Sequence, residues 1–136
     1  MKIERPNQVW QTDISYIPMF KGFMYLAAII DVKRRKILNW SVSNSMTAEW
    51  CVELLKDTIQ KHGTTEIHNS DQGSQYTSDV YINILKKHKI KISMDGKDLI
   101  LRGGNIVFGY LNISIQNDFG ALLNKRKSIL TLQMEA

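Results

Sequence analysis

The spacing of hydrophobic residues changes once along this chain, from a strand-like pattern to a helical one. Three early segments are rich in β-branched and aromatic residues, which favours strands over Val9–Ile17, Phe23–Val32 and Lys36–Ser43. From Thr47 onward, apolar residues recur at helical spacing, interrupted by short strand-like segments. Three successive strands followed by alternating helices and strands favour an α/β fold, with a mixed sheet and helices packed on it.

The two faces of the first strand differ in polarity. Side chains alternate across a strand, so one face consists of Trp10, Thr12, Ile14 and Tyr16. We expect this more apolar face to pack on the core, and Asp13 lies on the other. The second strand is apolar on both faces as far as Asp31, which predicts a central strand covered on both sides.

Helix-capping residues indicate two helices. Thr47 can cap a helix that ends near His62, with Gly63 just beyond it. The predicted buried face of this helix consists of Ala48, Cys51, Val52, Leu55 and Ile59. The remaining expected elements are a helix from the Ser78 cap to about His88 and short strands over Glu66–Ser70 and Lys91–Met94.

Composition favours one soluble domain. The chain has 136 residues, 43% of them hydrophobic, which is enough for one core. Its longest apolar run, Phe23–Ile30, is far shorter than the about 20 residues of a membrane-spanning helix. The first residues lack the apolar stretch of a signal peptide. The single cysteine, Cys51, excludes an internal disulfide, so we expect a cytoplasmic protein with no membrane partner.

The chain is basic, with a formal net charge of +5 from 18 Lys and Arg against 13 Asp and Glu. This balance fits a polyanionic partner, although a basic domain without such a partner explains it equally well. Basic residues cluster at Lys33–Lys36, Lys86–Lys89 and Lys125–Lys127. The first cluster is expected to be a solvated turn, which would contact phosphate only if it borders the acidic residues described next.

Two aspartates stand out by their positions. Asp13 lies in the middle of a strand, where a carboxylate is costly to bury unless it is paired or binds a cation. Asp71 follows a predicted strand and precedes Gly73, which lets the backbone approach a ligand. If the two strands are neighbours, both carboxylates reach one site suited to a hard cation such as Mg²⁺. Alternatively, Asp13 pairs with a basic residue and Asp71 merely starts a turn.

Four stretches, in order, resemble bacterial insertion-sequence transposases with a retroviral-integrase-like catalytic core. They are Arg5–Pro18, Tyr25–Trp40, Asn69–Ser78 and Ile92–Gly96. The combination is highly specific, whereas any one short motif would not be. We therefore divide the chain into the N-terminal and central part of a catalytic core, residues 1–96, and a divergent segment, residues 97–136.

The resemblance implies a ribonuclease H-like fold with a mixed five-stranded sheet flanked by helices. It also implies a DDE active site that binds two Mg²⁺ or Mn²⁺ ions and performs DNA strand cleavage and transfer. By that likeness, Asp13 and Asp71 are the first two catalytic acids and metal ligands. DNA is the implied partner, and self-association is left open.

The third acid of the family has no counterpart. The family places a glutamate on a helix some three dozen residues after the second aspartate, and in the matching register this chain has Gly109. No glutamate occurs between Glu66 and Glu135. We therefore expect an irregular segment over residues 97–136, degraded by mutation or frameshift, and a core that is inactive. The alternative is a non-catalytic DNA-binding or subunit-poisoning fragment.

Overall fold

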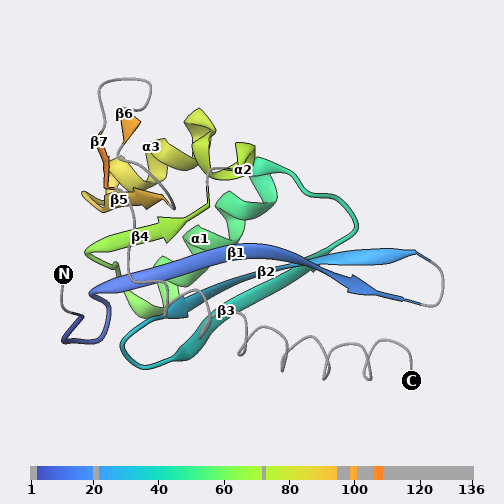
Figure 1. Cartoon of the computed structure of the whole chain (residues 1–136), viewed down its shortest axis with the longest axis horizontal. Coiled ribbons are helices and arrows are strands. Elements are labelled where there is room, and N and C mark those ends of the chain that lie inside the picture. Colours follow the sequence, from blue (N-terminus) through green and yellow to red (C-terminus); the bar gives the residue numbers. More distant parts are fainter. Residues whose placement is uncertain (1–2, 20–21, 72, 95–98, 101–105, 109–136) are drawn as a thin grey trace.

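The computed structural model describes residues 3–19, 22–71, 73–94, 99–100 and 106–108 (Figure 1). Within these ranges the elements are β1 (Val9–Pro18), β2 (Phe23–Asp31), β3 (Lys36–Ser43), α1 (Ala48–His62), β4 (Ile67–Ser70), α2 (Ser74–Thr77), α3 (Asp79–Lys87), β5 (Lys91–Met94), β6 (Leu99–Ile100) and β7 (Ile106–Phe108). In this part of the chain, no helix is long and apolar enough to cross a membrane.

The strands form one mixed sheet in the order β3-β2-β1-β4-β5-β7-β6. β1, β2 and β3 form the predicted antiparallel meander, and β4 and β5 continue the sheet in parallel with β1. This arrangement confirms the predicted mixed sheet. The two short strands β6 and β7, which the sequence did not predict, extend it beyond β5. Most of the segment expected to be irregular, including Gly109, lies outside the described residues.

Both predicted helix caps are present. The Thr47 hydroxyl accepts a hydrogen bond from the backbone N–H of Trp50 at 3.2 Å, and α1 ends at Gly63, whose φ of +77° suits glycine. The Ser78 hydroxyl similarly caps α3. The single turn α2, which precedes that cap, was not predicted.

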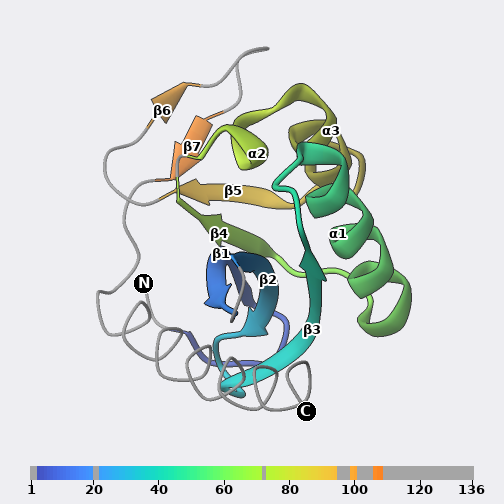
Figure 2. The ribbon, with the colours of Figure 1, turned by 90° about the vertical axis from the view of Figure 1, so that its right-hand side faces the viewer.

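The main core lies between α1, α3 and one face of the sheet (Figure 2). Cys51 and Leu55 are buried on α1 as predicted, and Leu54 and Thr58 are buried beside them. α1 also packs against α3, so its buried face is wider than the predicted stripe. Thr58 tolerates burial because its hydroxyl donates to the Leu54 carbonyl at 2.7 Å.

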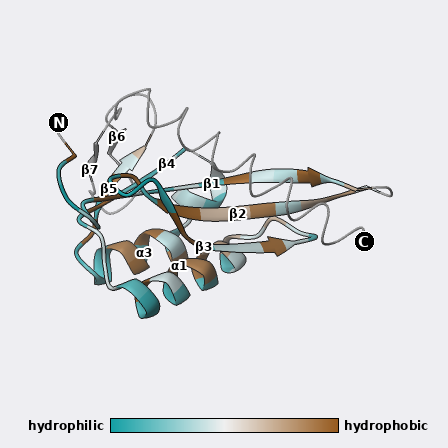
Figure 3. Ribbon diagram, turned by 90° about the horizontal axis from the view of Figure 1, so that it is seen from below, coloured by the Kyte–Doolittle hydropathy of each residue, from teal (hydrophilic) through white to brown (hydrophobic). Residues whose placement is uncertain are grey.

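A second apolar cluster lies on the opposite face of the sheet. Its buried members are Ile17, Leu26, Ala28 and Ile30. Residues of β2 are thus buried on both faces of the sheet, which confirms the prediction of a central strand covered on both sides. Figure 3 shows the resulting band of hydrophobic residues along β2.

The predicted core face of β1 is wrong at Tyr16. Trp10 and Thr12 are buried and Ile14 packs against the core, but Tyr16 is 61% exposed. The β1–β2 hairpin extends past the helices, so its outer end has nothing from α1 or α3 to pack against (Figures 1 and 3). Helix coverage, which strand periodicity does not reveal, decides which residues of this face are buried.

Asp31 anchors the turn between β2 and β3. Its buried carboxylate accepts hydrogen bonds from the backbone N–H groups of Asn7 and Lys33 and forms a 3.0 Å ion pair with Arg34. Asp31 therefore joins the end of β2 to the basic turn that follows it. The carboxylate is stabilised at this buried position because several donors surround it.

Candidate active site

The sheet brings the strand that carries Asp13 next to the strand that leads into Asp71. β1 and β4 are parallel and pair in register from Val9 with Ile67 to Gln11 with Asn69. Asp13 and Asp71 each lie two residues beyond that last pair, Asp13 still within β1 and Asp71 directly after the end of β4. Residues two apart on a strand share a face, so Asp13 belongs to the face that carries Gln11.

Asp13 is half-buried within β1. Its cross-strand partner is Ala28 of β2, a member of the second apolar cluster. One carboxylate oxygen, Oδ1, accepts a hydrogen bond from the backbone N–H of Ile14 at 2.8 Å. This bond restrains the orientation of the carboxylate.

Asp71 is exposed at the end of β4. Its Oδ1 accepts a hydrogen bond from the backbone N–H of Gly73 at 2.8 Å, which closes a tight turn. A Cβ atom at Gly73 would lie 2.8 Å from that same oxygen and 2.9 Å from Oε1 of Gln75. The sequence predicted that Gly73 permits a close backbone approach, and the approach found here is to the Asp71 carboxylate itself.

A buried aromatic group joins the Asp71 segment to β1. Tyr76, on α2, contacts the Thr12 hydroxyl at 3.4 Å, and that hydroxyl donates to the Ala28 carbonyl. Since the Thr12 proton is used there, Tyr76 is the donor. The Tyr76 ring packs edge-on against Tyr81 of α3, with 5.2 Å between ring centroids. These contacts hold the turn after Asp71 against the strand that carries Asp13.

His68 completes this group from β4. Its Nε2 lies 2.7 Å from the Tyr81 hydroxyl, while its Nδ1 is buried with no hydrogen-bond partner among the described residues. Burial lowers the pKa of His68 to about 4, so the ring is neutral at pH 7. Burial also raises the pKa of Tyr76 and Tyr81 well above the ordinary phenol range. Sequence reasoning gave His68 no specific role, although its place opposite Trp10 in the strand register is a sign of burial.

Cys51 lies on α1 beside this aromatic group and is buried, as predicted. Burial raises the pKa of its thiol to about 11, and the charge of Asp71 adds to that shift. The thiol is therefore protonated and unreactive at neutral pH.

The basic turn at Lys33–Lys36 lies at the other end of β1. It follows Asp31, whose cross-strand partner is Trp10, near the start of that strand. Asp71 instead extends beyond the carboxyl end of β4. The basic turn was expected to contact phosphate only if it borders Asp13 and Asp71. The strand register places it away from them, so this condition is not met.

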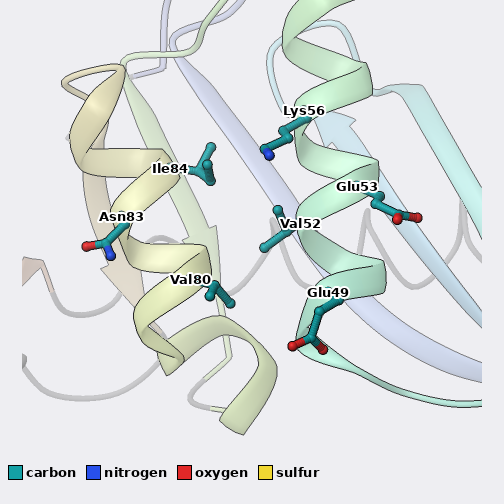
Figure 4. Close-up of a pocket in the computed structure, with 7 residues that line it drawn as sticks. All are labelled: Glu49, Val52, Glu53, Lys56, Val80, Asn83 and Ile84. Carbon is teal, nitrogen blue, oxygen red and sulfur yellow. The ribbon is translucent and has the colours of Figure 1, made fainter.

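A shallow groove lies apart from the two acids, between α1 and α3. Its volume is about 430 Å³, and Figure 4 shows apolar Val52 and Ile84 facing each other across it, with Glu49 and Glu53 along one side. Neither Asp13 nor Asp71 lines it. This groove therefore does not contain the candidate acids.

The donor set fits a divalent cation held by two carboxylates. Mg²⁺ prefers oxygen ligands and is commonly bound by one or two carboxylates together with waters and substrate phosphates. Asp13 and Asp71 supply two such groups from neighbouring strands. In the described ranges, no group of three or more acidic, cysteine or histidine side chains is placed to hold a metal ion. Asp79 starts α3, and Asp95, Asp98 and Asp118 fall outside those ranges.

Comparison with known proteins identifies an integrase core domain and insertion-sequence transposases as relatives. The family model described as integrase core domain matches residues 3–97. The transposase of insertion sequence IS629 from Shigella sonnei is 39% identical over 85 residues, covering 62% of this chain and 29% of the relative. Transposase InsF of IS3A from Escherichia coli K12 is 37% identical over 94 residues, covering 68% and 33%. The chain thus spans about a third of the length of these relatives.

Solved structures share the fold. The catalytic core domain of BIV integrase aligns with a TM-score of 0.66 at 18% identity, covering 90% of this chain and 68% of that one. The HTLV-2 integrase catalytic core domain in complex with magnesium, in a dimeric form, aligns with a TM-score of 0.60 at 21% identity, covering 65% and 61%. These likenesses confirm the predicted ribonuclease H-like architecture.

Proposed function

The chain belongs to the integrase core domain family found in insertion-sequence transposases, and from that membership we propose that it forms a transposase core that binds DNA and a divalent cation through Asp13 and Asp71. The observation that supports this proposal is that β1, which carries Asp13, pairs in parallel with β4, which leads directly into Asp71. A solved integrase core of the same fold was determined with magnesium, which supports Mg²⁺ or Mn²⁺ as the ion.

Each aspartate has a distinct part in the proposed site. Asp13, half-buried in a strand, supplies a carboxylate whose position is set by the sheet and by the Ile14 N–H. Asp71, exposed at the end of β4, supplies a second carboxylate whose position is set by the Gly73 N–H. When bound in such a site, a divalent cation stabilises the negative charge that develops around a reacting phosphate.

The same core is proposed to lack strand-transfer activity. The position that matches the family's third acid is Gly109, which has no side chain to bind a cation. With two carboxylates, the site can hold one ion together with a DNA phosphate, whereas a second ion lacks its ligand. We therefore expect binding without efficient cleavage.

This expectation favours a second candidate function, that of a non-catalytic fragment. A core that still binds DNA, or that still associates with active transposase subunits, would compete with them. The observation in its favour is again Gly109, because loss of one catalytic acid affects chemistry more than it affects the fold.

Two measurements on the full chain test these proposals. The first is strand transfer on a labelled duplex that carries the terminal repeats of a related insertion sequence, with Mg²⁺ or Mn²⁺. We expect no product, and product formation that depends on Asp13 would contradict the inactive core. The second is DNA affinity across a salt series. We expect affinity that falls as salt rises, because bound phosphates release counterions. Absence of any DNA binding would contradict the proposed core and leave only a fragment that acts by associating with transposase subunits.

A further inference from the structure

The outer end of the β1–β2 hairpin carries an aromatic ladder, defined here as the exposed Tyr16 and Phe23 and the half-buried Tyr25. Tyr16 is 61% exposed and Phe23 52% exposed, and the outer end of the hairpin extends past the helices that cover the rest of this face (Figure 1). Successive rings pack edge-on, with centroids 6.0 Å apart for the first pair and 5.3 Å for the second. Large exposed aromatic surfaces are unusual on a soluble domain unless they contact a partner.

The ladder is built by the strand register. Tyr16 pairs with Tyr25 and Pro18 pairs with Phe23 across the two strands, so all three aromatic rings lie on the same face of the hairpin. Edge-on packing supports each ring by its neighbour while leaving ring surface open to solvent. The ladder is thus a pre-formed surface, which requires little ordering when a flat partner binds.

The charge of the hairpin sequence favours a polyanion over a basic partner. From Ile14 to Ile30 the only charged residue is Lys21, and there is no Asp or Glu. A phosphate backbone can therefore approach the ladder without repulsion from a carboxylate in the outer part of the hairpin. The net charge of +5 on the chain acts in the same direction and disfavours contact between two copies.

Position along β1 connects the ladder to the proposed site. Tyr16 is three residues after Asp13 on the same strand, so their backbones are about 10 Å apart at the usual rise per residue while their side chains lie on opposite faces of the sheet. The described pairing of β4 with β1 covers only Val9–Gln11, so a nucleic acid strand at Asp13 can pass around the outer part of β1 toward the ladder. A few nucleotides span that distance.

We propose that the Tyr16–Phe23–Tyr25 ladder stacks unpaired DNA bases next to the strand whose phosphate lies at Asp13 and Asp71. This inference rests on the proposed function, since it names the form of DNA that the same region binds. Aromatic rings stack on bases without regard to sequence, because every base has a π-face. Duplex DNA keeps its bases stacked on one another and offers the ladder none.

The test measures fluorescence anisotropy of labelled single-stranded and duplex oligonucleotides with the full chain. The variants are Tyr16→Ala with Phe23→Ala, the ring-preserving Tyr16→Phe, and Val80→Ala as a control at an exposed apolar residue of α3. We expect the double variant to bind single strands about tenfold or more weakly, with duplex affinity unchanged. Tyr16→Phe and Val80→Ala should bind like the wild type, and thermal melting should show that all variants fold.

Each other outcome overturns the inference. Equal losses for single strands and duplex, or no loss for either, would show that the ladder does not bind unpaired bases. Unchanged DNA affinity with a loss of self-association by sedimentation would assign the ladder to a second copy of the chain. If the wild type binds no DNA at all, the proposed function fails as well. If it binds DNA in a salt-dependent way and the variants match it, only the ladder inference fails.

Discussion

Asp13 within β1 and Asp71 directly after β4 each lie two residues beyond Gln11 and Asn69, the last pair that joins these two parallel strands. They are far apart in the sequence, and the crossover through α1 brings their strands together. Asp13 lies within β1, whereas Asp71 lies in the turn that follows β4. The position of one carboxylate is therefore fixed by a strand and that of the other by a turn. The predictions below test this arrangement and the core beneath it.

Gly73→Ala should weaken Mn²⁺ binding while leaving the free energy of unfolding nearly unchanged. The new Cβ would lie 2.8 Å from Oδ1 of Asp71, and that carboxylate must turn away because it is the more easily moved group. We expect the free energy of unfolding to fall by less than about 1 kcal/mol, while Mn²⁺ affinity falls clearly. Urea denaturation and Mn²⁺ titration measure the two effects. Ser74→Ala, at the next residue, is the matched control, and equal Mn²⁺ affinity in both variants would contradict the role of Gly73.

His68 should make the protein less stable in mild acid. Its pKa is about 4 in the folded state against 6.5 in an open chain, so the unfolded state binds the extra proton between these values. Stability contributed by the neutral ring is complete above pH 6.5 and is lost as pH falls toward 4. Between pH 7 and pH 5 we expect a loss of roughly 2 kcal/mol.

Denaturant unfolding at both pH values provides the measurement. His68→Gln should remove most of this pH dependence, whereas His88→Gln, at the half-buried end of α3, should retain it. A wild-type stability that stays constant from pH 7 to pH 5 would show that His68 is not buried as described.

Asp31→Ala should destabilise the fold strongly. The mutation leaves the backbone N–H groups of Asn7 and Lys33 without their acceptor and the partly exposed Arg34 without its ion-pair partner. A loss of about 2–3 kcal/mol is expected, because several hydrogen bonds to a buried carboxylate are removed together. Asp57→Ala, which removes the exposed pair with Lys61 and one hydrogen bond from Asn39, should cost less. Comparable melting temperatures for the two variants would rule out the anchoring role of Asp31.

Cys51 should report on opening of the core. With a pKa of about 11, roughly one thiol in a thousand is ionised at pH 8, and the side chain is also buried. Because the chain has one cysteine, reaction with a thiol reagent gives a single signal. We expect slow modification in the native protein and fast modification in urea. Rapid modification without denaturant would contradict the packing of α1 on the sheet.

Much of the fold could be predicted because its signals are local. Thr47 and Ser78 are good helix caps, and each is followed by residues that form an apolar helix face. The β2 sequence is apolar on both faces, which predicts a central strand. The nearness of Asp13 and Asp71 was predicted only on the condition that their strands are neighbours, since strand order is a tertiary property. The register of β1 with β4 then meets that condition.

The rest depends on contacts that sequence periodicity does not contain. Tyr16 lies on the same face of β1 as the buried Trp10 and Thr12, but it is exposed because the helices do not cover this end of the strand. The group of Tyr76, Tyr81 and His68 comes from three elements and forms only when they pack. β7 contains β-branched residues that favour a strand, but its place beside β5 comes from sheet pairing at long range.

Mn²⁺ binding by a double-mutant cycle tests the shared site most directly. Electron paramagnetic resonance would measure Mn²⁺ affinity for the full chain, Asp13→Asn, Asp71→Asn and the double variant, with Asp79→Asn as the exposed control on α3. If both carboxylates hold one ion, each single variant should lose at least about tenfold in affinity, and the double variant should lose much less than the product of the two. Affinities that match the wild type in both single variants, or losses that multiply independently, would contradict a common site.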